Sequence, residues 1–327
     1  HTEKPGKVIP DFGLTDSIKP TVQWVVTEWK IRQPGGNQFD GTSRELFRAD
    51  MVSGIHGMQE ITFNPLAKPG NSDYGNLYIG IGDGGSVEDG YLQLIHRKDR
   101  VFGTILRINP AGKNSKNGKY GIPPDNPFLN ETNKETIREI FAMGFRNPHR
   151  ITWTSDGRML VSNIGQKNIE SLYVVRAGDD CGWPVREGSF ELFPESDLGN
   201  ISNLPPNDSK HNFTYPLAQY DHDEGVAITG GYEYTGSALP ALKDKFFFGD
   251  IPSGRLFFID LKDVSNGEKV TIREWRIKVN GEHKTLTDIC GKRVDLHFGR
   301  DANGELYLFT KADGKMYKMA AVGKSQK

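Results

Sequence analysis

An arginine and an asparagine stand side by side in the segment Gly144–Pro148, at the expected end of a strand. The guanidinium of Arg146 is planar and always charged, so it binds carboxylate and carbonyl oxygens in a fixed geometry. Asn147 adds an amide beside it. The pair is therefore suited to gripping an anionic, carbonyl-rich ligand, with a plain salt bridge from Arg146 to a carboxylate as the alternative.

More polar groups follow along the chain, in the stretch Asn163–Gln166 and at Glu170. We expect the chemistry of the chain to lie in this region. The acidic loop Asp221–Glu224 also has the ligand types of a metal site, although such a loop usually faces water. Within it, we expect His222 over the mouth of the site.

Glycine and cysteine positions give three further expectations. The run Gly82–Gly85 resembles a phosphate-binding loop, but no helix is expected after it, so we predict an ordinary turn. Trp183, in the turn Cys181–Pro184, is predicted to lie in the core rather than to serve as a platform for a sugar. Cys181 and Cys290 are the only cysteines, and the sequence leaves a disulfide and two buried thiols equally open.

The composition restricts the partners of the chain. Its 327 residues include 41 basic and 42 acidic side chains, so no net field favours nucleic acid or an anionic membrane. No apolar run approaches the roughly eighteen residues that a membrane helix needs. The 38 glycines and 18 prolines indicate many turns. Because the chain begins at His1 without a methionine, we expect that a segment has been removed or left out.

Strands must position these residues, because the dominant pattern is strand, turn, strand. Gln23–Ile31 is rich in β-branched and aromatic residues, and a hairpin unit then recurs with variations. Each unit resembles the inner hairpin of a propeller blade, which buries both faces only by stacking on its neighbours. The predicted hairpins combine Met58–Pro65 with Asn76–Asp83, Ile151–Trp153 with Met159–Ser162, Phe246–Asp250 with Ser253–Phe258, and Leu296–Phe298 with Glu305–Phe309.

Helix is expected to be scarce. Thr132–Phe141 is the one modest candidate, and it is expected to end in a strand. Residues 111–135 and 189–224 are rich in Asn, Pro, Lys and Ser, so we predict that both are long surface loops.

Motifs along the chain resemble the glucose/sorbosone dehydrogenase family, and the likeness runs from about His56 to Met319. They are, in order, Gly103–Pro110, Tyr120–Phe128, Arg146–Pro148, Gly165–Glu170 and Gly182–Pro184. The resemblance implies an all-β fold, a six-bladed β-propeller of the soluble quinoprotein glucose dehydrogenase type. It also implies dependence on pyrroloquinoline quinone (PQQ) and calcium.

The resemblance assigns roles at the centre of the expected site. His56 falls where the family keeps its catalytic base, and an imidazole that titrates near neutrality can accept the proton of an alcohol. Arg146 and Asn147 match the pair that holds the carboxylate and carbonyl oxygens of the quinone.

The resemblance also assigns the calcium ligands. The backbone carbonyls of Gly165 and Gln166 match those that coordinate the calcium ion on the cofactor, and hard oxygen ligands suit Ca²⁺. Glu170 matches a carboxylate ligand of a nearby structural calcium, together with the carbonyl of Cys181. A plain hydrogen bond between neighbouring blades is the alternative for Glu170.

Several positions depart from the active members of the family. Their histidine is usually followed by two glycines, whereas here Gly57–Glu60 places Glu60 nearby. Their Ser-Leu-Lys turn, whose lysine contacts the cofactor, is replaced by Asp250–Arg255. That replacement is more similar to the propeller of hedgehog-interacting protein, a binding module.

The remaining candidate cofactor contacts also differ from the family. The Arg-X-Arg-Asp cluster of active members reads Lys292–Asp295 here, which leaves Lys292 and Arg293 as candidates. His149 stands where a glutamine is common, and it is counted with them. Thr21–Ile31 resembles the third strand of the second blade. We therefore expect residues 1–327 to form a single propeller domain that lacks roughly the first one and a half blades of the family.

Two functions of different classes follow. The first is a periplasmic or extracellular oxidoreductase that transfers hydride from an aldose or related polyol to PQQ, with His56 as base and an unknown electron acceptor. The second is a non-catalytic, calcium-stabilised propeller that binds a protein or a glycan. The loss of the family lysine favours the second, whereas the histidine, the Arg-Asn pair and the Gly-Gln pair favour the first.

Overall fold

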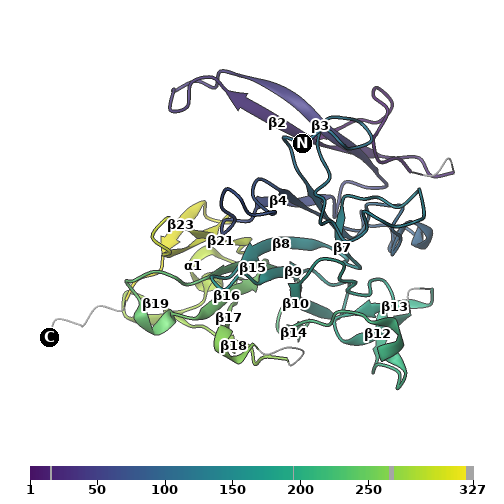
Figure 1. The fold of residues 1–327 in the computed structure, drawn as a ribbon. Coiled ribbons are helices and arrows are strands. Elements are labelled where there is room, and N and C mark those ends of the chain that lie inside the picture. The colour runs from purple at the N-terminus through teal and green to yellow at the C-terminus, as the bar shows by residue number, and fades with distance from the viewer. Residues whose placement is uncertain (15–16, 194, 265–268, 322–327) are drawn as a thin grey trace. The chain divides into compact units, whose positions relative to one another are not determined.

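The computed structural model describes residues 1–14, 17–193, 195–264 and 269–321, and these are mainly strands and turns (Figure 1). The expected all-β class is confirmed. Helix in the described residues is limited to α1 (Leu286–Cys290) and to short 3-10 turns, η1 (Leu92–Leu94), η2 (Asp208–His211), η3 (Pro240–Leu242) and η4 (Leu261–Asp263). None of these helices has the length and apolar character needed to cross a membrane. The chain divides into two compact units, His1–Asn147 and Pro148–Lys327. The six-bladed, single-domain organisation stays a prediction.

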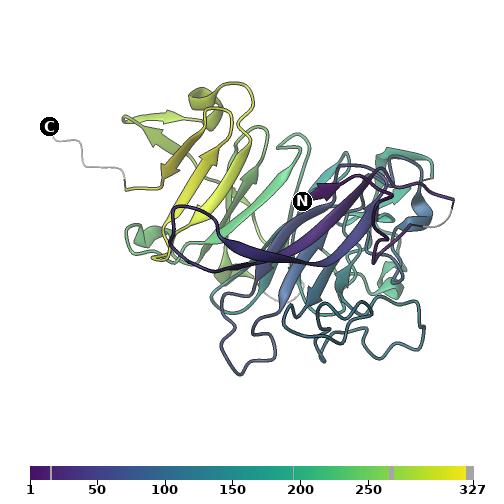
Figure 2. The same ribbon diagram turned by 90° about the horizontal axis from the view of Figure 1, so that it is seen from above.

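The described residues of the first unit form two antiparallel sheets. One has the order β1-β2-β3, and Figure 2 shows β2 and β3 as a long hairpin at the purple end of the chain. The other is a meander in the order β4-β5-β6-β7, as expected for a blade. The strands are β1 (Thr2–Glu3), β2 (Val22–Ile31), β3 (Gly41–Met51), β4 (Met58–Phe63), β5 (Leu77–Ile81), β6 (Thr104–Ile108) and β7 (Ile140–Met143). The predicted strand over Gln23–Ile31 and the predicted pairing of β4 with β5 are confirmed.

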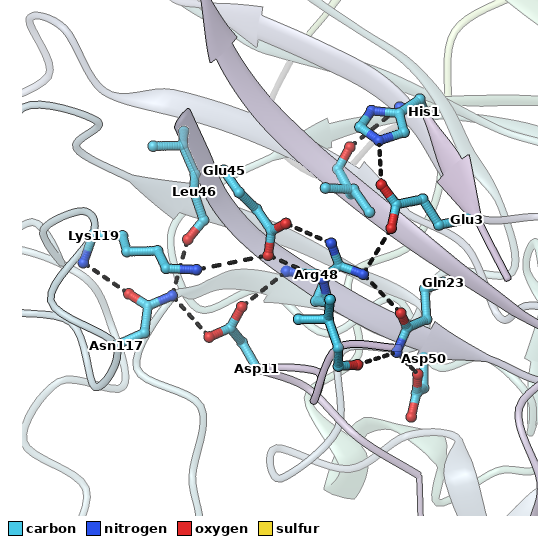
Figure 3. A network of polar contacts seen from close by, with 12 residues as sticks. His1, Glu3, Asp11, Gln23, Glu45, Leu46, Arg48, Asp50, Asn117 and Lys119 are labelled. Atoms are coloured by element: carbon cyan, nitrogen blue, oxygen red, sulfur yellow. Dashed lines mark hydrogen bonds and ion pairs between the residues drawn. The ribbon is translucent and has the colours of Figure 1, made fainter. Parts of the chain in front are cut away.

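A buried arginine ties the N-terminal sheet to its surroundings (Figure 3). The guanidinium of Arg48 on β3 donates to Gln23 on β2 at 2.8 Å and to Glu45 at 3.0 Å. The amide of Arg48 donates to Asp11 at 2.9 Å, and the other oxygen of Asp11 accepts from Asn117 at 2.9 Å. The bonds of the guanidinium offset the cost of removing its charge from water. The bonds through Asp11 connect β3 to the loop at Asn117.

In its described residues, the second unit contains three antiparallel sheets that stack on one another and two further small ones. Their strand orders are β14-β10-β9-β8, β15-β16-β17-β18, β21-β22-β23, β11-β12-β13 and β19-β20. The predicted hairpins appear as β8 with β9, β16 with β17, and β21 with β22. The strands are β8 (Pro148–Trp153), β9 (Met159–Asn163), β10 (Ile169–Val175), β11 (Arg186–Glu187), β12 (Phe190–Phe193), β13 (Asp197–Ser202), β14 (Ala218–Asp221), β15 (Ile228–Glu233), β16 (Lys245–Asp250), β17 (Leu256–Asp260), β18 (Arg273–Glu274), β19 (Ile277–Val279), β20 (Glu282–Lys284), β21 (Leu296–Arg300), β22 (Leu306–Thr310) and β23 (Lys315–Lys318).

The three stacked sheets of the second unit pack face to face. Successive side chains of a strand point to opposite faces of its sheet. Accordingly, Phe246 and Phe248 of β16 pack in a core with Leu160 and Leu172 of the preceding sheet. Phe247, between them, packs in a different core with residues of β21 and β22. The first strand β15 also contacts β8 and β21, the first strands of the sheets on either side. This stacking is the one expected of neighbouring propeller blades.

Two expectations about individual segments were wrong. Thr132–Phe141 forms turns instead of the expected helix, although it ends in a strand, β7, as expected. The guanidinium of Arg138 donates to the carbonyls of Phe128, Glu131 and Asn133 and so stabilises these turns. Residues 189–224 are not one long loop, since β12, β13, η2 and β14 all lie within them.

Candidate active site

The turn after β5 gathers the candidate residues of the first unit. A Cβ atom at Gly82 would lie 2.5 Å from the carbonyl oxygen of His56 and 3.0 Å from Oδ1 of Asn147, so only glycine allows this close approach. The amide of Asp83 donates to the carbonyl of Arg146 at 2.7 Å. The predicted turn is therefore confirmed, and it places His56 beside Asn147 and joins Asp83 to Arg146.

The imidazole of His56 is held by a buried carboxylate. Its Nδ1 lies 2.8 Å from Oδ1 of Asp83, which also accepts from the amide of Gly85 at 2.9 Å. Since an ionised carboxylate only accepts, Nδ1 of His56 carries the proton, and the neutral ring keeps Nε2 as an acceptor. Asp83 is 1% exposed, whereas the His56 side chain is 15% exposed. This pair has the chemistry of an oriented general base.

The backbone at His56 is itself unusual. Its φ angle is 47°, in the left-handed region that residues other than glycine rarely adopt. Such a conformation persists only where the surroundings enforce it, and it is common at functional sites. The strained backbone is therefore consistent with a functional role in which the imidazole of His56 must point in one direction.

Arg146 and Asn147 follow β7 and are 6% and 4% exposed. Nη2 of Arg146 lies 3.8 Å from Oε1 of Glu88, which is long for a hydrogen bond. Because the Glu88 side chain is 45% exposed, this ion pair is worth little in water. A buried guanidinium joined through its backbone to the His56 turn fits the carboxylates of an anionic cofactor such as a quinone acid.

In the second unit, the predicted calcium loop folds around two buried carboxylates. The amide of Gly165 donates to Glu170 at 3.1 Å. The amides of Gln166, Lys167, Asn168 and Ile169 then all donate to Oε1 of Glu187, at 2.7, 3.1, 3.0 and 3.1 Å. A Cβ atom at Gly165 would lie 1.9 Å from the carbonyl oxygen of Ile169, so this loop requires glycine there. The carbonyls of such a loop are the hard oxygen donors that calcium prefers, so the donor set fits the implied ion.

Glu170, on β10, is fully buried and has hydrogen-bond partners at both oxygens. Besides Gly165, Oε1 lies 3.1 Å from Nε2 of His222, and Oε2 accepts from the amide of Ile228 at 2.8 Å. Burial raises the pKa of the Glu170 carboxyl, and the contact with His222 opposes that shift. The calcium role of Glu170 stays a prediction.

The two cysteines, both among the described residues, are free thiols, and Trp183 is buried as predicted. Burial also raises the pKa of the Cys181 thiol. The described part of the chain brings no three His, Cys, Asp or Glu side chains together as a metal cluster.

The turn Asp250–Arg255 stands where active members of the family carry their lysine, and an aspartate, Asp250, holds it in place. Asp250 is fully buried and accepts from the amides of Val226, Ala227 and Ser253 at 2.7, 2.8 and 2.9 Å. Arg255, at the end of this turn, pairs with Glu274 at 2.9 Å. The side chains of this turn are therefore used to hold it together.

The other predicted cofactor contacts also lie in the second unit. Lys292 and Arg293 are exposed on the loop after α1, where Nε of Arg293 donates to Asp295 at 2.6 Å. His149 is partly buried on β8. Their roles towards a cofactor stay predictions.

Sequence reasoning missed Asp83 and Glu187. Asp83 stands in a Gly-Asp-Gly-Gly run directly after a strand, and an acid at such a turn was a usable signal. Glu187 gave no signal, because β11 comes next to the loop at Gln166 only through tertiary folding.

The sequence profile of the family described as Glucose / Sorbosone dehydrogenase matches residues 26–318. The HIPL1 protein of Arabidopsis thaliana is 27% identical over 94% of this chain and 45% of its own length. Quinoprotein glucose dehydrogenase B of Acinetobacter calcoaceticus is 24% identical, over 64% of this chain and 45% of its own. The chain thus spans less than half the length of these curated relatives.

A solved structure shows the same fold. The PQQ-bound aldose sugar dehydrogenase from Streptomyces coelicolor matches with a TM-score of 0.57 and 21% identity, over 93% of this chain and 70% of that one. The profile match covers most of the chain and includes the Arg146–Asn147 pair and the loop after Gly165. The chain therefore belongs to the Glucose / Sorbosone dehydrogenase family.

Proposed function

We propose that the protein is a sugar dehydrogenase that oxidises an aldose or a related polyol with the help of PQQ and calcium. The observation that carries this proposal is the His56–Asp83 pair. The 2.8 Å contact fixes the proton on Nδ1 and keeps Nε2 as the base for the hydroxyl proton of the substrate. Asp83 then stabilises the imidazolium that forms, as the carboxylate does in other oriented histidine bases. Membership of a dehydrogenase family supports the same reading.

The proposal assigns a set of residues to each cofactor. In this proposal, Arg146 and Asn147 bind the carboxylate and carbonyl oxygens of the quinone, and the carbonyls of Gly165 and Gln166 bind calcium. When bound, the quinone supplies a hydride acceptor that the calcium ion polarises. Further proposed contacts are His149, Lys292 and Arg293 to the quinone and Glu170 and the Cys181 carbonyl to calcium. We place the protein in the periplasm or outside the cell.

A second function is favoured by one specific observation. The turn Asp250–Arg255 lacks the lysine that contacts the cofactor in active members, and the buried Asp250 closes it instead. The alternative is a non-catalytic propeller that keeps calcium for structure and binds a protein or a glycan.

Titration of the calcium-loaded protein with PQQ, followed by a panel of aldoses, separates the two functions. We expect calcium-dependent binding, seen by absorbance and heat, and then reduction of the quinone. His56→Ala should abolish turnover while quinone binding is retained, and His283→Ala, an exposed histidine on β20, should behave as wild type. A folded protein that binds no quinone, or a His56→Ala variant with unchanged turnover, would contradict the proposal.

A further inference from the structure

The loop after β9 presents five successive backbone amides to two buried acids. They run from Gly165 to Ile169, with the first bound to Glu170 and the other four converging on one oxygen of Glu187. The other oxygen of Glu187 accepts from the Asn168 side chain at 2.8 Å. Five hydrogen bonds from residues 166–169 thus end on Glu187, so we expect the loop conformation to depend on this carboxylate.

The geometry of the peptide bond shows where the carbonyl groups of this loop point. In a planar trans peptide, the C=O of one residue and the N–H of the next point in opposite directions. Because the amides of 166–169 point at Glu187, the carbonyls of Gly165, Gln166, Lys167 and Asn168 point away from it. The carbonyl of Asn168 accepts from the amide of His222 at 3.2 Å. The carbonyls of Gly165, Gln166 and Lys167 precede it in the loop, and each of them points away from Glu187.

The carboxylate also acts electrostatically. A buried negative charge on the N–H side polarises each peptide group, which increases the negative character of the carbonyl oxygen on the other side. Glu187 itself is held in place, because its neighbour Arg186 donates to Asp208 at 2.9 Å and β11 pairs with β12. Lys167, the only cationic side chain of this loop, is exposed.

We propose that Glu187 is a positioning residue that holds the loop 165–168 with its carbonyl oxygens presented to a hard divalent cation, Ca²⁺. The inference rests on the calcium of the proposed function, but it assigns the arrangement of the site to a residue that contacts no ligand. Glu187 would act through the backbone, and its own oxygens stay on the amides.

The test is a calorimetric titration with CaCl₂ alone, without quinone or sugar, well below the melting temperature. Glu187→Gln keeps the shape of the side chain but replaces a charged acceptor by a neutral one, and we expect calcium affinity to fall at least about tenfold. Glu195→Gln, an exposed acid of the same unit, should leave the affinity unchanged.

A milder variant covers the case in which Glu187→Gln does not fold. Asn168→Ala removes the side-chain bond to Glu187 and a longer bond to the carbonyl of Leu198, and we expect a several-fold loss of calcium affinity. If wild type binds calcium and both folded variants bind it equally well, Glu187 has no positioning role, although the proposed function stands. If folded wild type binds no calcium, the calcium part of the proposed function fails, and this inference fails with it.

Discussion

At the scale of single residues, the chemistry depends on which nitrogen of His56 carries the proton. Asp83 fixes that choice, because its carboxylate accepts from Nδ1 and can offer no donor. In Asp83→Asn the new amide can turn its NH₂ towards Nδ1, which would move the proton to Nε2 and remove the base. We expect kcat to fall by about 10²–10⁴-fold with little change in quinone affinity. Steady-state kinetics beside a quinone titration measures both quantities.

The matched control for that variant is Asp89→Asn. Asp89 is an exposed acid close to Asp83 in the chain, so its neutralisation changes the net charge equally without reaching His56. An Asp83→Asn enzyme with the kcat of the Asp89→Asn enzyme would show that the orientation of His56 does not limit catalysis.

At the scale of elements, β16 has an apolar side chain on each face of its sheet. Phe247 is fully buried in the core shared with β21 and β22, while Phe246 and Phe248 fill the core on the other face. Phe247→Ala leaves a cavity that the stacked sheets cannot easily close, so the free energy of unfolding should drop by about 3–5 kcal/mol. Urea unfolding measures the drop, and Phe309→Ala, at a partly exposed position on β22, should cost much less. Equal losses would mean that the two sheets are not packed as described.

The individual strands also show how much of the secondary structure the sequence predicts. Phe246–Asp250 and Met159–Ser162 were found as strands because they are short apolar runs next to turn residues, although both strands are buried on both faces. The helix expected in Thr132–Phe141 does not form, and the Arg138 contacts that stabilise the turns there follow no sequence periodicity.

The candidate site was predictable to a similar degree. The resemblance pointed to His56 and to the Gly165–Gln166 pair. Asp83 and Glu187 act on them through hydrogen bonds between distant parts of the chain, which depend on the folded backbone rather than on local pattern.

At the scale of the whole molecule, a bound ion stabilises whatever part of the chain forms its site. A ligand at a hundred times its dissociation constant adds about 2.7 kcal/mol to the free energy of unfolding. The proposed calcium loop lies wholly within the unit Pro148–Lys327. Calcium should therefore raise the urea midpoint of the wild-type protein, EDTA should reverse the shift, and Glu187→Gln should show a much smaller one.

Hydrogen exchange distinguishes a bound ion from a general salt effect, because it reports on each unit separately. With calcium, we expect greater protection of the amides of β9, β10 and the loop between them, whose donors already point at Glu170 and Glu187. Magnesium at the same concentration should protect them less, because it demands a regular octahedron and gives up its water reluctantly. Equal protection by both ions throughout the chain would indicate ionic strength alone, and the loop would then have no specific site for calcium.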